Sequence, residues 1–229
     1  MFANGPGLLI VLGGTGAATL LSYPLDQILR ALRTVKVLFR NEPFYTEADV
    51  EEITDVARVW YRGQIHQVEN ELNNISSPFL RLGIQLVIDG TPVDDIFDVL
   101  QWRVARLKAQ ERAEAQVFRA MASYSPAFGM VGTLIGLINM LYELRGGGFD
   151  EIGANMAIAL ITTFYGIVFA NLLFKPTAVK LEARTNQRVA LLGLAMEGIT
   201  LLSQKRSPSY VRETLLSFLT DHGDEVRQR

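Results

Sequence analysis

Cysteine is absent from this 229-residue chain, and histidine occurs only twice, at His66 and His222. Without cysteine, the chain can form neither a disulfide nor a thiolate metal site. The two histidines lie far apart with no other ligand beside them, so we expect no zinc or other metal site. The glycine-rich "GGTGAAT" lacks the Lys-Ser/Thr ending of a phosphate-binding loop. With no nucleophile–base pair either, the sequence predicts neither an enzyme nor a cofactor.

A basic excess is also missing, because the formal net charge is −2, and this argues against a nucleic-acid partner. Charge of either sign is missing from three windows, residues 1–25, 120–142 and 152–174. Each window is long enough to cross about 30 Å of hydrocarbon as a helix of roughly 20 residues. No strand pattern competes with these helices. The predicted fold is therefore all-α, an integral membrane protein with three transmembrane helices and a helical cytoplasmic domain.

The distribution of Lys and Arg predicts how these helices cross the membrane. Twelve of the 22 basic residues lie between the first and second windows, nine follow the third, and only Arg145 lies between the second and third. Because cytoplasmic flanks collect Lys and Arg, the middle segment and the tail are expected inside. The organisation that follows is a span at 1–25, a cytoplasmic domain at 26–119, a span at 120–142, a periplasmic turn at 143–151, a span at 152–174 and a cytoplasmic tail at 175–229.

The polar parts read as helices as well. From Pro92 no further Pro or Gly occurs until Pro126, which predicts one helix of roughly 50 residues that runs on into the membrane. The tail predicts a helix after Pro176 and a last one around "SPSYVRETLLSFL". The N-terminal "MFANGPGLLIV" has no positively charged region, so a cleaved signal peptide is not expected.

Small residues interrupt the second and third windows. Lipid tails are as apolar as leucine, so helices in a membrane associate through small residues that let their backbones approach. The glycines expected to do this are Gly129, Gly132 and Gly136 in the second window and Gly166 in the third.

Thr133 and Thr163 lie centrally on these small-residue stripes. Each hydroxyl either bonds to the carbonyl four residues earlier in its own helix or lines a polar path through the membrane. No ionisable side chain lies within any window, whereas ion carriers usually keep an intramembrane Asp or Glu. If the chain conducts ions, a partner helix must supply the titrating group.

The motifs "PAFGMVGTLIGLINML" and "AIALITTFYGIVFANLLFKPTAVKLEAR" closely resemble the MotA/PomA family, the larger subunit of the flagellar motor stator. "NGPGLLIVLGGTGAATLLSYPL" resembles that family's second transmembrane helix, and "GITLLSQKRSPSYVRETLLSFL" resembles its C-terminal cytoplasmic motif. The family has four spans, so the expectation is that the first is missing here, either because the start is internal or because the chain is truncated.

The rival resemblance is to the ExbB/TolQ family, which energises outer-membrane transport or maintains envelope integrity. That family has three spans with an outside N-terminus, which is the topology predicted above. Its hairpin reads closer to "GLLGTVxG", without "PAFGM" or "TLIGL", and its tail lacks the ending found here. We therefore keep it as the alternative function.

The stator resemblance implies a homopentamer in the bacterial inner membrane, around two copies of a MotB/PomB-type partner whose single helix carries the ion-binding Asp. Passage of H⁺ or Na⁺ would turn the ring against the rotor switch protein FliG.

The same resemblance implies roles for individual residues. Pro126 and Pro176 would couple ion passage to conformational change, and Thr133 and Thr163 would line the ion path. Arg62 and Glu69 are the charged candidates nearest the family's rotor-contact pattern, although Tyr61 is the alternative match for the basic position. Without the resemblance, Arg62 and Glu69 would be read as residues of a solvated helix face.

Overall fold

The computed structural model describes residues 4–38, 47–63, 68, 75, 77–146 and 149–227. All regular structure in these residues is helical, which confirms the all-α prediction. Three helices are long and apolar enough to cross a membrane, and they lie within Gly5–Ser22, Val93–Leu144 and Ile152–Ser203. Their number agrees with the three charge-free windows. The chain divides into two compact units, Met1–Asn41 with Gln110–Arg184 (unit 1) and Glu42–Ala109 with Thr185–Arg229 (unit 2).

Unit 1 begins with one continuous helix made of α1 (Gly5–Leu8), the π-helical turn η1 (Leu9–Gly13) and α2 (Gly14–Ser22). The side chain of Asn4 caps its start by accepting a hydrogen bond from the N–H of Gly7 at 2.9 Å. The helix stops before Pro24 because the residue preceding a proline is pushed into extended backbone, and Tyr23 has φ −133° and ψ 146°.

The helix α3 (Leu25–Leu38) follows and is amphipathic. Its Ile28, Ala31 and Val35 pack into the core of unit 1 with residues of α7 and α9, whereas Leu25 and Leu29 on another face are exposed. Gln27 Nε2 donates to the carbonyl of Ala113 at 2.9 Å, which ties α3 to α7.

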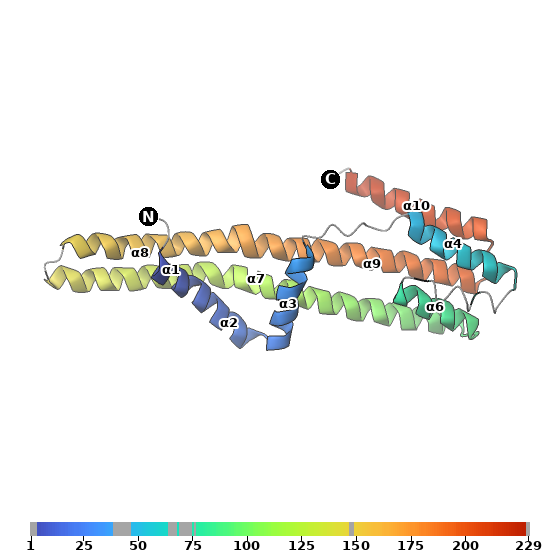
Figure 1. Ribbon diagram of the computed structural model, residues 1–229, viewed down its shortest axis with the longest axis horizontal. Helices are drawn as coiled ribbons and strands as arrows, with labels where there is room; N and C mark the ends of the chain where they lie inside the picture. Colours follow the sequence, from blue (N-terminus) through green and yellow to red (C-terminus); the bar gives the residue numbers. More distant parts are fainter. Residues whose placement is uncertain are drawn as a thin grey trace. The chain divides into compact units, whose positions relative to one another are not determined.

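The central hairpin of unit 1 is formed by α7 (Val93–Gly146) and α8 (Phe149–Val168), which run antiparallel in Figure 1. The predicted continuous helix leading into the second charge-free window is α7, with 54 residues. After α8, the π-helical turn η2 (Phe169–Phe174) leads directly into α9 (Lys175–Ser203). The tail helix predicted after Pro176 is α9, which already includes the proline in its first turn.

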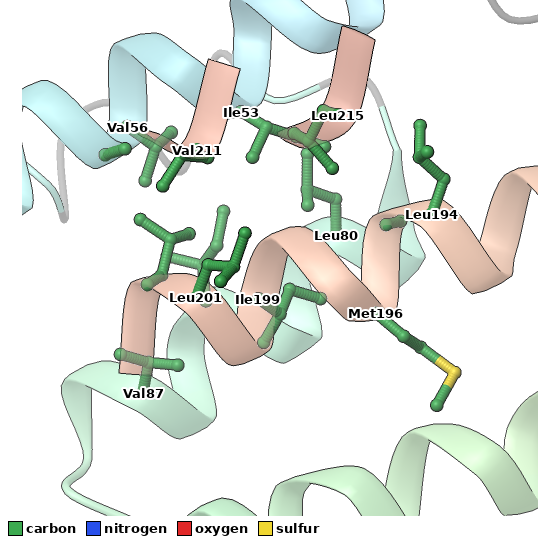
Figure 2. Close-up of a cluster of buried hydrophobic side chains, with 14 of the residues drawn as sticks. Ile53, Val56, Leu80, Val87, Leu194, Met196, Ile199, Leu201, Val211 and Leu215 are labelled. Carbon is green, nitrogen blue, oxygen red and sulfur yellow. The ribbon is translucent and has the colours of Figure 1, made fainter. Parts of the chain in front are cut away.

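Unit 2 is a helical cluster built from α4 (Glu47–Tyr61), α6 (Pro78–Ile88), the first part of α7, the last part of α9 and α10 (Pro208–Arg227). Figure 2 shows its core, where side chains from α4, α6, α9 and α10 meet. Ile53, Leu80, Ile199 and Leu215 are almost fully buried there. Figure 1 shows α4 and α10 side by side, and Arg212 on α10 pairs with Glu51 on α4 at 2.9 Å.

Candidate functional site

The two helices of the hairpin touch through their backbones at glycine. A Cβ atom at Gly166 would lie 2.7 Å from the carbonyl oxygen of Ser125 and 3.2 Å from the Cα atoms of Gly129 and Pro126. A Cβ at Gly129 would lie 3.0 Å from the carbonyl oxygen of Thr162. These distances are shorter than ordinary van der Waals contact. Glycine at both positions is therefore what permits this approach.

The same interface continues towards the hairpin turn. A Cβ at Gly132 would lie 2.6 Å from Cβ of Thr162, and one at Gly136 would lie 2.7 Å from Cβ of Ala159. All four glycines named from the sequence thus face the opposite helix of the hairpin at distances that exclude a larger residue.

Thr133 and Thr163 meet across this interface, and their hydroxyl groups are in direct hydrogen-bond contact. Thr133 Oγ1 also lies 3.1 Å from the carbonyl oxygens of Gly129 and Ala159, and Thr163 Oγ1 lies 3.4 Å from the Gly129 carbonyl oxygen. Both residues are half-buried. We call these two hydroxyls and two carbonyl oxygens the oxygen cluster.

The oxygen cluster contains the packing bond that the sequence offered as one alternative for Thr133, and it adds contacts across the hairpin. Thr133 can bond to the carbonyl four residues earlier, as a packing hydroxyl would, and it also reaches across to the other helix. A hydroxyl has one proton, so it can serve only one of these acceptors at a time. The Ala159 carbonyl oxygen also accepts a hydrogen bond from Thr162 Oγ1 at 2.9 Å, so the lone pairs left in the cluster are mainly those of the two hydroxyls. Neutral oxygens of this kind are ligands that hard cations accept.

Two prolines flank the hairpin contact. Pro126 lies inside α7 and has no N–H, so the carbonyl of Ala122 loses its usual helical partner. Pro176 is exposed near the start of α9, immediately after η2. A π-helical turn is one way in which a continuous helix accommodates a local break in its hydrogen-bond ladder.

Ser125 is a residue of the hairpin interface that the sequence did not single out. Its side chain is fully buried, and its Oγ has no hydrogen-bond partner among the described residues. It lies beside Pro126, and its carbonyl oxygen is the atom that a Cβ at Gly166 of α8 would meet at 2.7 Å. No sequence pattern marks it, because a serine before a proline is common in many contexts.

The first helix of unit 1 packs against the same hairpin. A Cβ at Gly14 would lie 2.2 Å from the ring of Phe128, and the hydroxyl of Tyr165 accepts a hydrogen bond from the N–H of Asn4 at 3.0 Å. The buried hydroxyls of Thr15 and Thr19 donate to carbonyls four residues earlier, at 2.6 and 2.7 Å. These two hydroxyls therefore act as packing groups within their own helix.

Outside the charge-free windows, Arg119 on α7 forms a two-bond ion pair with Glu182 on α9, with N···O distances of 2.5 and 2.6 Å. The hydrogen bonds from Arg119 lower the pKa of the Glu182 carboxyl, and Arg112 adds a smaller effect in the same direction. The hydrogen bond to Glu182 in turn raises the pKa of Arg119. The two residues are 63 positions apart in the sequence, and no local sequence pattern predicts that they pair.

The two rotor-contact candidates fare differently. Arg62 is exposed just after α4, and Glu69 lies outside the described residues. The structure therefore does not bring these two together at a described site. Within the described ranges, no group of three or more His, Asp or Glu side chains could hold a metal ion.

Comparison with known proteins gives matches that cover the hairpin of α7 and α8. The sequence model of the MotA/TolQ/ExbB proton channel family matches residues 71–193. Motility protein A of Aquifex aeolicus (strain VF5) is 33% identical over 93% of this chain and 84% of its own length. Chemotaxis protein PomA of Vibrio alginolyticus is 32% identical over 96% of this chain and 86% of its own length. A chain in the solved structure of the flagellar MotAB stator complex from Bacillus subtilis is 26% identical and has a TM-score of 0.86, over 99% of this chain and 88% of that chain. The region matched by the family model includes both helices that carry the oxygen cluster.

Proposed function

We infer a torque-generating, ion-conducting role for this chain, which belongs to the MotA/TolQ/ExbB proton channel family and, within it, to the MotA/PomA subunits of the flagellar motor stator. It acts in a membrane complex with a MotB/PomB-type subunit and transports H⁺ or Na⁺. We propose that the complex is a homopentamer around two copies of the partner, in the bacterial inner membrane, and that it turns the rotor through the switch protein FliG.

The oxygen cluster is the observation that carries this proposal. Thr133 and Thr163 place two hydroxyls beside two carbonyl oxygens inside the apolar hairpin. No carboxylate lies in any of the three charge-free windows. Such a site can solvate a passing cation, but it cannot hold a proton or balance a charge. The partner's acidic residue must supply that function, so the chain works as one half of a channel.

We propose the orientation from the charge count in the sequence. The polar residues 26–119 and the tail 175–229 would be cytoplasmic, and residues 143–151 would be periplasmic. Moving one charge through about 100 mV releases about 2.3 kcal/mol, which sets the energy available per ion. Pro126 and Pro176 would let the helices α7 and α9 change their bend as each ion passes.

Rotor contact is proposed at Arg62 and Glu69, the charged pair taken from the family pattern. Arg62 is free to act in this way because its side chain is exposed.

A paired substitution at residue 133 tests the ion path. Thr133→Ser keeps the hydroxyl, and Thr133→Val removes it while nearly conserving the volume. Each variant would be expressed with its MotB/PomB-type partner in a strain that lacks its own stator. The expected result is near-normal swimming with Thr133→Ser and, with Thr133→Val, a roughly 2- to 13-fold higher ion concentration for half-maximal speed, the equivalent of one neutral hydrogen bond of about 0.5–1.5 kcal/mol.

Thr177→Val is the matched control, because the hydroxyl of Thr177 bonds to the carbonyl of Leu173 in its own helix at 2.6 Å and lies outside the oxygen cluster. Removing sodium at a constant proton gradient identifies the ion. If Thr133→Val swims like Thr133→Ser at every ion concentration, the oxygen cluster is a packing feature and the proposed ion path is wrong.

A further inference from the structure

The first span and the hairpin meet at one level of unit 1, where their apolar segments end. The hydroxyls of Ser22, the last residue of α2, and Tyr124 on α7 lie 2.9 Å apart. The hydroxyl of Tyr23 donates to the carbonyl of Gln116 at 3.5 Å. Tyrosine is enriched where a membrane meets water, and charged residues return close to this level in both segments. The edge of the hydrocarbon therefore lies here, and the helix α3 begins here, at Leu25.

The helix α3 crosses α7 at this edge instead of running beside it. Gln27 Nε2 donates to the carbonyl of Ala113 at 2.9 Å. Thr34 Oγ1 lies at hydrogen-bond distance, 2.7 Å, from Oε2 of the buried Glu114. The two residues of α3 are about 10 Å apart along its axis, yet their partners are neighbours in α7. Figure 1 shows this crossing. Because α7 runs through the bilayer, a helix laid across it lies close to the plane of the membrane surface.

The contacts of α3 also define which of its sides faces the membrane. The side with Gln27 and Thr34 bonds to residues 113–114, outside the charge-free window. The next side, centred on Ala31, packs in a cluster that includes Phe118, which is nearer the window. Going round α3, the contacts thus move towards the window. At 3.6 residues per turn, the side that comes next points beyond these contacts, towards the hydrocarbon.

This membrane-facing side is a stripe of three leucines. Leu25, Leu29 and Leu32 recur at helical spacing and are 63%, 51% and 49% exposed. Two leucines in the last turn of α2 are exposed as well, so the apolar surface of the span continues onto α3. Single exposed leucines are ordinary, but a continuous apolar surface of this kind marks an interaction site. We call Leu25, Leu29 and Leu32 the leucine stripe.

The remaining side of α3 carries its charges. Arg30 and Arg33 are exposed there, beside the leucine stripe. Arg30 lies 3.8 Å from Asp26, one turn earlier, whereas Arg33 has no ion-pair partner among the described residues. With Lys36, the sequence gives α3 three basic residues and one acidic residue. A long basic side chain at the edge of the hydrocarbon can keep its stem in the apolar region and its charge among the headgroups.

We propose that α3 lies in the surface of the bilayer and that Arg33, with Arg30, binds the headgroups of anionic phospholipids. The leucine stripe enters the outer part of the acyl region, as in other amphipathic surface helices with leucine on one face and basic residues on another. The bonds of Gln27 and Thr34 to α7 fix the rotation of α3 about its axis, so the arginines are held at headgroup level. This inference goes beyond the proposed stator function and requires only that the apolar helices span a membrane.

Fluorescence quenching at single cysteines tests the position of α3, because the chain has no cysteine of its own. Leu29→Cys is labelled in the complex with a cysteine-free form of the partner, in nanodiscs. A nitroxide carried on the lipid acyl chain should quench this label strongly, and aqueous iodide should quench it weakly. Val99→Cys is the control, because Val99 is an exposed apolar residue about 30 Å of helix before the charge-free window. The lipid nitroxide should not quench the label at position 99.

The same label measures which lipids gather at α3. Quenching at position 29 is compared for spin-labelled phosphatidylglycerol and spin-labelled phosphatidylcholine at equal mole fraction. The anionic lipid should quench more. Arg33→Gln should lower this preference by up to about fivefold, the effect of one basic residue at a membrane surface. Arg103→Gln removes the same charge from an exposed position of α7 in unit 2, and it should leave the preference unchanged.

Two results would overturn the proposal. A label at position 29 that the lipid nitroxide does not quench means that water or protein covers the leucine stripe. Equal quenching by the two lipids, or a preference that Arg33→Gln leaves unchanged, means that α3 has no anionic headgroup site. Ion flux is measured on the same complex in vesicles. A complex that passes the lipid test but conducts no ions contradicts the stator function alone, so the two failures are distinguishable.

Discussion

Replacing Gly166 by alanine tests whether the hairpin depends on direct backbone contact. The new Cβ would lie 2.7 Å from the Ser125 carbonyl oxygen, whereas ordinary contact begins at 3.4 Å. The helices α7 and α8 must therefore separate locally by about 0.7 Å, because the groups met by the Cβ are backbone atoms and no flexible side chain can move aside. Overpacking of this kind typically costs about 1–3 kcal/mol.

Gly153→Ala on the same helix is the matched control. Its Cβ would meet nothing within 4 Å. Both substitutions gain the same helix propensity, up to about 1 kcal/mol relative to glycine, so the difference between them isolates the clash. For a chain of this size, a loss of about 1–3 kcal/mol lowers the thermal midpoint by roughly 2–12 °C.

The assay is thermal unfolding of the purified complex in one detergent, followed by circular dichroism. Gly166→Ala should unfold below Gly153→Ala by the amount given above. It should also swim more poorly, because separating the helices moves Thr163 away from the Gly129 carbonyl, now 3.4 Å from its hydroxyl. Equal midpoints for the two variants would refute the backbone contact on which the geometry of the oxygen cluster depends.

Two further outcomes follow from buried or paired polar groups. Glu182→Gln should lower the thermal midpoint at pH 7, because the lowered pKa of Glu182 gives stability that is present above its unfolded value near 4.3 and is lost as pH falls through the lower folded value. The two midpoints should therefore approach each other on acidification below the unfolded value, and a difference that does not narrow at all until the protein unfolds in acid would contradict a role for the ion pair with Arg119. Ser125→Ala removes a buried hydroxyl that has no hydrogen-bond partner among the described residues. The variant complex should therefore be more stable to chemical or thermal unfolding, by about 1–3 kcal/mol. A large loss of stability would mean that this hydroxyl is bonded in the protein.

The features that the sequence predicts well are those that composition alone determines. The length of the charge-free windows predicts the three apolar helices, because an uninterrupted apolar segment in a bilayer satisfies its backbone hydrogen bonds by forming a helix. The absence of Gly and Pro between Pro92 and Pro126 predicts the long helix α7. The helix positions of the four glycines place them on stripes, and those stripes face the neighbouring helix.

The features that the sequence did not predict depend on register between distant segments. Thr133 contacts Thr163 because the two helices are joined at one particular turn, and a shift of one residue would separate them. The pairing of Arg119 with Glu182 has the same origin. At Pro176 the sequence predicts the helix that follows but not its direct continuation from η2, because a π-helical turn before the proline allows the helix to continue. The left-handed backbone of Lys205 could not be predicted from the sequence, since the residues favoured in that conformation at the end of a helix are Gly and Asn.

In the proposed stator, the position of Pro126 has a mechanical consequence. Gly166 and Gly129 leave no side chain between α7 and α8 at the level of this proline. A side chain can absorb a small displacement by rotating about its bonds, but two backbones in contact cannot. A change of bend at Pro126 must therefore move α8 with α7, and the hydrogen bond that the proline removes from the carbonyl of Ala122 lowers the cost of bending at that point. The contact that holds the oxygen cluster together is then also the contact that transmits its movement along both helices.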